Sequence, residues 1–191
     1  THTPVPAGHD HFSAGMIAPA HALRARFTEV LFASGGFPGE HPPHGSHPRL
    51  DPLYSSGGLT ARHAEAGRTR LDKVRAIAAW PEAMAVLEVC LHHEIPAPNV
   101  VNCGRCEKCV RTMLAFAAIG RLDAAVTFPD RGRLADRLGA LRLTGTLSVS
   151  YANETLAALK AEGRRDLADV LSGKLSEAER RERRHRGWWR R

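Results

Sequence analysis

The pattern of apolar and polar residues predicts helices alternating with short strands in the first half of the chain. Between Ser13 and Phe27, apolar side chains recur near the helical period, although Pro19 inside this stretch favours a late start or a kink. Residues 28–33 (T-E-V-L-F-A) form a short β-rich run that stops at Ser-Gly-Gly, which is typical of a buried strand. A helix that leads into such a strand indicates a layered α/β fold.

A long irregular region and a second helix–strand pair follow. Residues 37–59 are dense in Pro, Gly and His, and we expect a functional or mobile loop there. A helix is predicted over 69–80, because Thr69 and Asp72 have the spacing of a capping box, and Pro81 suits the first turn of another short helix. Residues 85–91 (A-V-L-E-V-C-L) then predict a second strand, which leads into a loop at 92–102.

The second half of the chain is predicted to be helical. Residues 106–119 carry an apolar stripe, Gly120 stands where a glycine often ends a helix, and further helices are expected over 134–141 and 153–171. We expect four parts: a disordered tail or severed linker at 1–12, an α/β domain at 13–122, a helical extension at 123–179 and a basic Arg/Trp tail at 180–191. Because the chain starts at Thr1 rather than methionine, we expect it to be processed, trimmed or a fragment.

Composition and charge narrow the class of protein. The chain has 191 residues, of which 43% are hydrophobic and 25% charged, a balance typical of globular proteins. No stretch reaches the roughly 20 apolar residues of a membrane span, and no secretory leader is visible, so we expect a protein of the reducing cytoplasm.

The formal net charge of +7 is concentrated at the end of the chain, where seven arginines and one acid, Glu182, lie within 180–191. The body is therefore close to neutral, so its charge gives no reason to expect that it binds nucleic acid. In the tail, arginines beside Trp188 and Trp189 suit phosphate contact and base stacking, an anionic membrane surface, or a solvated end without a partner.

The four cysteines have the spacing of a metal site, Cys90-x12-Cys103-x2-Cys106-x2-Cys109. A C-x2-C turn lets two thiolates face one ion, and the start of a helix favours their negative charge. We therefore predict one structural zinc ion held by four sulfurs, with no open position for water. An iron–sulfur cluster and thiols without a metal, including redox-active ones, are the alternatives.

Residues 102–111 (N-C-G-R-C-E-K-C-V-R), followed by an apolar helix that ends at Gly120, resemble the zinc-binding end of the 7-cyano-7-deazaguanine synthases. The four cysteines and Arg111 match that pattern. These enzymes belong to the PP-loop ATP pyrophosphatases, so the resemblance implies a Rossmann-like (adenine nucleotide alpha hydrolase-like) partial layer with a zinc knuckle of four cysteines that leads into a helix. It also implies ATP-dependent C–N bond formation or amidation of a small acid through an adenylate.

A weaker similarity extends upstream. Residues 51–53 (D-P-L) and 70–74 (R-L-D-K-V) resemble the family's T-P-L stretch and the helix start behind it, and 45–56 resembles uncharacterised relatives. The resemblance implies that the binding cleft for a small-molecule substrate is lined by Ser46, His47, Asp51 and Ser55. Arg70 and Lys73, at a helix start, either bind phosphate or form a solvated basic face. Arg111 contacts either a nucleotide phosphate or the carbonyls of the zinc loop.

One departure from the family changes the functional expectation. PP-loop enzymes hold ATP with an S-G-G-x-D-S loop, whereas residues 34–39 read S-G-G-F-P-G, without the Asp-Ser pair. We therefore expect the C-terminal half of such a protein, with ATP and Mg²⁺ bound only when an N-terminal PP-loop half is present as a partner. Whether this chain is itself an enzyme stays open. The alternative function is a zinc-stabilised module that binds nucleic acid through its basic tail.

Overall fold

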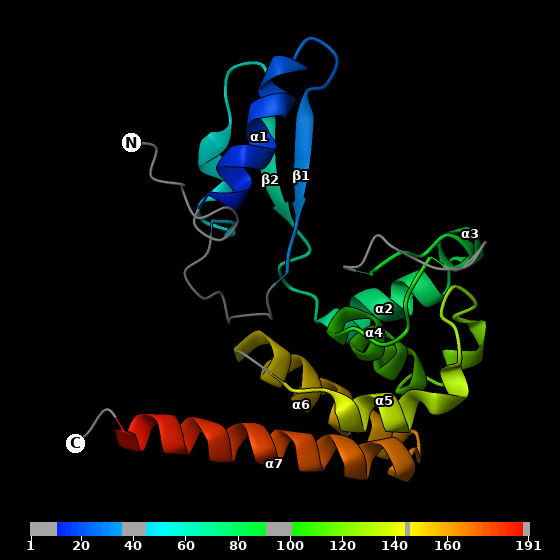
Figure 1. The fold of residues 1–191 in the computed structure, drawn as a ribbon. Coiled ribbons are helices and arrows are strands. Elements are labelled where there is room, and N and C mark those ends of the chain that lie inside the picture. The colour runs from blue at the N-terminus through cyan, green and yellow to red at the C-terminus, as the bar shows by residue number, and fades with distance from the viewer. Residues whose placement is uncertain (1–10, 36–44, 91–100, 144–145, 189–191) are drawn as a thin grey trace. The chain divides into compact units, whose positions relative to one another are not determined.

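A computed structural model describes residues 11–35, 45–90, 101–143 and 146–188, with the side chains at 146–147 and 185–188 excepted. The chain divides into two compact units, residues 1–70 and 71–191. The protein is mixed α/β and mostly helical (Figure 1). Within the described ranges, no helix combines the length and apolar character that crossing a bilayer requires.

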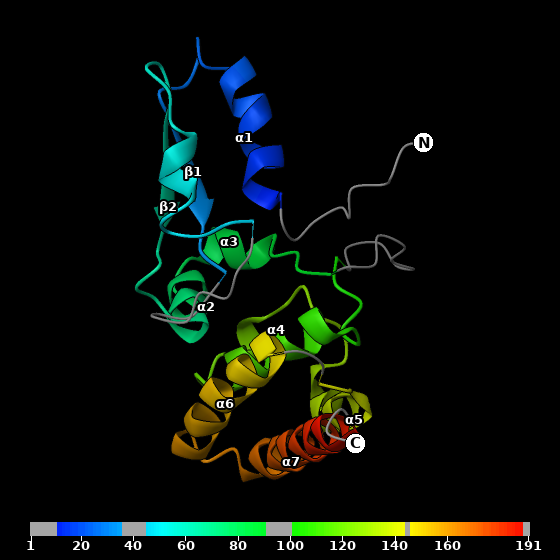
Figure 2. The same ribbon diagram turned by 90° about the vertical axis from the view of Figure 1, so that its left-hand side faces the viewer.

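The first unit is a small parallel strand pair with a helix on one face (Figures 1 and 2). Its elements are α1 (Phe12–Ala22), β1 (Glu29–Ala33), the 3-10 helix η1 (Asp51–Tyr54) and β2 (Thr60–Ala64). The two strands pair in register, from Glu29 opposite Thr60 to Ala33 opposite Ala64. Its core consists of Ile17, Phe32, Leu59 and Ala61.

The sequence prediction for this unit is correct in part. The strand at 28–33 is confirmed as β1, but it is not a buried strand: Phe32 is buried, whereas Leu31 is 58% exposed. A pair of strands with one helix beside it has only one covered face, so alternate residues stay outside. The helix expected over 13–27 ends at Ala22, and strand β2 was missed because Ala61 is its only buried residue.

The second unit is a group of helices around α4 (Glu107–Ala117), which is buried on nearly every side. Helices α6 (Thr146–Ala161) and α7 (Arg165–Trp188) run side by side, and α5 (Leu134–Ala140) packs against α7 (Figure 2). The other elements are α2 (Arg70–Ala78), α3 (Pro81–Ala85), and the 3-10 helices η2 (Leu122–Ala124) and η3 (Arg131–Arg133).

Several helix ends agree with the sequence. Cys106 is the N-cap of α4, and Gly120 has the left-handed φ of +65° expected after a helix end. Pro81 begins α3, and the helices expected over 69–80 and 134–141 are confirmed as α2 and α5. The single helix expected over 153–171 is wrong, because the chain turns at Gly163, with φ +75°, between α6 and α7.

The strand expected over 85–91 is also wrong in its described part, residues 85–90. Helix α3 extends to Ala85, and residues 86–90 belong to neither helix nor strand. No neighbouring strand is present among the described residues of this unit. The N–H of Val89 instead donates to the side chain of Asn102 at 2.9 Å. A run of β-favouring residues becomes a strand only when another strand offers a hydrogen-bonding edge.

Candidate metal centre

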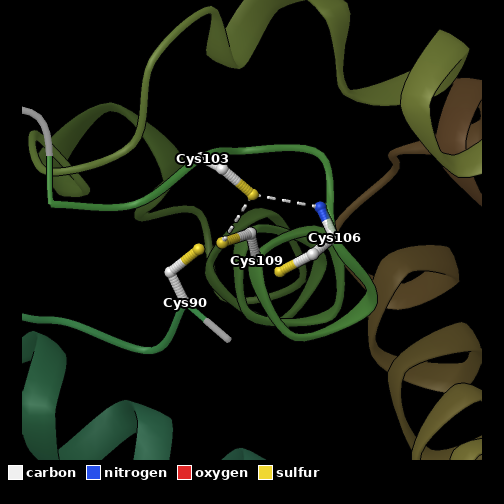
Figure 3. A group of neighbouring side chains, drawn as sticks. All are labelled: Cys90, Cys103, Cys106 and Cys109. Atoms are coloured by element: carbon white, nitrogen blue, oxygen red, sulfur yellow. Dashed lines mark hydrogen bonds between the residues drawn. The ribbon is translucent and has the colours of Figure 1, made fainter. Parts of the chain in front are cut away.

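The four cysteines converge on one point in the second unit (Figure 3). Their sulfur atoms all lie within 4.8 Å of one another, and those of Cys103 and Cys109 are 3.8 Å apart. A tetrahedron of sulfurs around a metal with bonds of about 2.3 Å has edges of about 3.8 Å. The donor set and its spacing therefore fit a single metal ion such as zinc.

The local sequence folds into this arrangement for two reasons. Cys106 caps α4 with an extended backbone and Cys109 lies in the first turn, so both thiols belong to the helix start, and the N–H of Cys106 donates to the Cys103 sulfur at 3.3 Å. Between them, Gly104 adopts φ +67°, a conformation that glycine takes at little cost. A Cβ there would collide with Nη1 of Arg137.

The electrostatics of the cluster favour a bound cation. Cys109 is fully buried, and its burial first, then the neighbouring Cys106, raise the pKa of its thiol well above the usual value. Several thiolates in so small a volume repel one another unless a positive charge lies between them. A bound metal ion would supply that charge, and the positive end of α4 would add to it.

Arg137 of α5 supports the turn that carries Cys103 and Cys106. Its Nη1 donates to the carbonyls of Gly104 at 2.8 Å and Pro129 at 2.9 Å, and its Nη2 donates to Asp130 Oδ2 at 2.8 Å. Sequence reasoning missed this residue, because 33 positions separate it from Gly104 and no local pattern links the two. The amide of Asn102 was missed as well, although it directly precedes Cys103.

The residues expected around a substrate are only partly brought together. In the first unit, the fully buried carboxylate of Asp51 accepts hydrogen bonds from Ser13 Oγ at 2.8 Å, Ser46 Oγ at 2.9 Å and the His47 N–H at 3.2 Å. It also pairs with His63 Nδ1 at 2.6 Å. Burial opposes ionisation, but these hydrogen bonds, the one from His63 foremost, outweigh it and hold the pKa of Asp51 below its usual value. Through these hydrogen bonds Asp51 organises the fold of this unit.

The other candidates in this region also have local contacts. The Ser55 hydroxyl donates to the Pro52 carbonyl at 2.7 Å and accepts from the Ala61 N–H at 3.0 Å, which ties η1 to β2. Arg70 and Lys73 lie in the first turn of α2, as predicted.

Arg111 lies on α4 beside the helix α6. Its guanidinium is 3.6 Å from Glu107 Oε1 and stacks over the ring of Tyr151 at 4.8 Å. The adjacent cavity has a volume of about 20 Å³, room for no more than about one water molecule. In this conformation Arg111 helps α6 to pack on α4.

Some predicted features lie outside the described residues. They include residues 1–10 of the tail at 1–12, residues 36–39 of the S-G-G-F-P-G segment, residues 37–44 of the loop at 37–59, residues 92–100 of the loop at 92–102, and residues 189–191. The remainder of the basic tail, from Arg180, continues helix α7 as far as Trp188.

Comparison of the chain with known protein families, with curated protein sequences and with solved structures finds no match.

Proposed function

We propose that the chain binds one Zn²⁺ ion through Cys90, Cys103, Cys106 and Cys109 in a structural site. The observation that carries this proposal is the convergence of four sulfurs within 4.8 Å of one another. Zinc prefers a closed tetrahedron of thiolates, and four protein ligands leave no position for a reacting water. An iron–sulfur cluster with several irons needs more space between its cysteine sulfurs than this site has. A single iron ion could fit the same space, and metal analysis distinguishes it from zinc.

The proposed ion joins two segments that share no secondary structure. Cys90 lies in the irregular segment after α3, while the other three ligands belong to the turn and first residues of α4. Because α4 is the central helix of the second unit, zinc binding contributes directly to the stability of that unit.

The test is metal content and affinity in the wild type and in Cys106→Ser. We expect about one equivalent of zinc in the purified, reduced wild type, and loss of tight binding with a lower melting temperature in the variant. Lys108→Ala is the matched control, because Lys108 is exposed in the same helical turn and is not a ligand. A variant that retains zinc like the control contradicts the proposal.

We further propose that this zinc-bearing chain is the C-terminal portion of a PP-loop ATPase related to 7-cyano-7-deazaguanine synthase. The proposal is supported by the motif at 102–111, by the position of that motif at the start of a helix closed by Gly120, and by the parallel pair β1–β2 beside α1. The reaction is ATP-dependent C–N bond formation or amidation of a small acid, with ATP and Mg²⁺ held by an N-terminal half.

The coding DNA upstream of Thr1 tests this family proposal. We expect an in-frame segment that encodes S-G-G-x-D-S after a predicted strand, and ATP–pyrophosphate exchange by the longer protein that includes it. An in-frame stop codon shortly before Thr1 contradicts the family proposal and leaves the zinc proposal unaffected.

A second candidate function, nucleic-acid binding, is favoured by the end of α7. Arg180, Arg183 and Arg184 are exposed there, on the face of the helix opposite the buried residues Leu167, Leu171 and Leu175. Residues 179–184 are all charged, so this stretch offers no apolar face for insertion into a membrane surface. An exposed row of guanidinium groups suits a phosphate backbone.

The test is binding of a labelled single-stranded oligonucleotide by the triple variant R180A/R183A/R184A. We expect weaker binding and a salt dependence whose slope falls by about 2, since each lost phosphate contact removes roughly 0.7. The control triple R75A/R133A/R142A removes the same charge from exposed positions outside α7. Equal weakening in both triples contradicts a binding site on α7, and wild-type binding only to anionic vesicles overturns the nucleic-acid proposal.

A further inference from the structure

The side chain of Asn102 is fully buried between segments that surround the cysteine cluster. Its Oδ1 accepts a hydrogen bond from the Val89 N–H at 2.9 Å. Its Nδ2 donates to the carbonyl of Leu87 at 2.7 Å, and to Thr127 Oγ1 at 3.1 Å and the Thr127 carbonyl at 3.4 Å. One amide therefore joins three segments that are far apart in the sequence.

The partners of this amide fix its orientation. A backbone N–H must face the oxygen, and two backbone carbonyls must face the nitrogen, so a flipped amide would lose these contacts. The same geometry requires both a donor and an acceptor on one short side chain. An apolar residue at this position would leave a buried N–H and buried carbonyls without these partners, at a cost in stability.

The position of Asn102 connects it with the metal ligands. Val89 directly precedes Cys90, Asn102 directly precedes Cys103, and Oδ1 of Asn102 lies 4.0 Å from the sulfur of Cys109. The segment 87–90 has no strand partner among the described residues, and its backbone hydrogen bonds at Leu87 and Val89 go to this side chain. The amide thus supplies, beside the cluster, the hydrogen bonds that a neighbouring strand would otherwise give to Leu87 and Val89.

We propose that Asn102 is a positioning residue that holds Cys90 against the turn carrying Cys103, so that the metal meets a preformed four-sulfur site. This inference rests on the proposed zinc site. Without the amide, the segment that carries Cys90 becomes ordered only when the metal binds. The entropy cost of this ordering then lowers the affinity for the metal. Residues that orient metal ligands typically change metal affinity by about 10- to 100-fold when they are mutated.

The experiment measures zinc affinity by competition with a chelator in Asn102→Ala, Cys90→Ser and the double variant. We expect Asn102→Ala to weaken binding about 10- to 100-fold. We expect the double variant to bind no more weakly than Cys90→Ser alone, because both changes remove the contribution of the same thiolate. The absorption of the Co²⁺-substituted protein, which reports the number of bound thiolates, should indicate fewer sulfurs in Asn102→Ala.

Two further variants separate positioning from general stability. Thr127→Val removes one acceptor of Nδ2 but leaves the contacts to Leu87 and Val89, so we expect near-wild-type affinity. Asn102→Asp keeps an acceptor for the Val89 N–H but loses the donor, and it decides the question if the alanine variant does not fold.

The outcomes are distinguishable. Wild-type affinity with four bound thiolates in Asn102→Ala or Asn102→Asp overturns the inference, as does additive weakening with Cys90→Ser. A wild-type chain that binds no zinc overturns the proposed function itself.

Discussion

At the scale of single residues, Asp51 and Cys109 show two ways of burying an ionisable group. Burial disfavours the charged form of both. For Asp51, donors from Ser13, Ser46, His47 and His63 outweigh this effect and keep the pKa low. For Cys109 the neighbours are other thiols, which raise the pKa further, so the thiolate form of Cys109 would need a cation close by. The protein itself supplies the groups that stabilise the Asp51 carboxylate, whereas the proposed zinc ion would stabilise the Cys109 thiolate.

The carboxylate of Asp51 should be essential to the first unit. Asp51→Ala leaves several buried donors without their acceptor, and we expect a loss of about 1–3 kcal/mol in stability. Hydrogen exchange of α1 and β2 measures this loss. Glu29→Gln is the control, because the Glu29–Arg62 pair is exposed and should contribute little. Equal hydrogen-exchange protection of α1 and β2 in both variants would contradict a stabilising role of Asp51.

The same carboxylate predicts a pH dependence. Because the folded pKa of Asp51 lies below its usual value of 3.8, the stabilisation is fully present above that value and is lost as the pH falls through the folded pKa. We expect NMR signals of the first unit to report this loss in acid, and Asp51→Ala to lack it. Wild-type NMR signals of the first unit that stay unchanged in acid would contradict this account.

At the scale of elements, the sequence predicted best where local rules decide. Helix α4 was predictable because its N-terminal cysteines, its apolar stripe and Gly120 all agree. The run at 85–91 was not, because strand formation depends on a partner that the sequence does not reveal. Likewise, the cysteine spacing predicted that the four thiols lie together, but the support from Asn102 and Arg137 depends on contacts across many residues.

The end of α4 offers a direct test of a local rule. Gly120→Ala places a Cβ at a left-handed φ of +65° and 2.6 Å from Oε1 of Glu162, so we expect a loss of about 1–2 kcal/mol, read as a lower melting temperature. Gly139→Ala in α5 is the control, since nothing lies within 4 Å of its added Cβ and alanine favours helix. A neutral Gly120→Ala contradicts the helix-end argument.

At the scale of the whole molecule, the two units are stabilised by different chemistry. The first has a small apolar core and a network of hydrogen bonds around the buried Asp51 carboxylate. The second has a larger helical core, within which the cysteine cluster lies at the start of its central helix. Metal removal should therefore loosen the second unit around α4 and leave the internal contacts of the first unchanged.

The most direct measurement is X-ray absorption at the zinc edge on purified, reduced protein, with the metal quantified in the same sample. We predict about one zinc per chain, with a first shell of four sulfurs at about 2.3 Å and no nitrogen or oxygen ligand. A fully folded protein that holds no metal, or a bound zinc with fewer than four sulfur ligands, would contradict the proposed site.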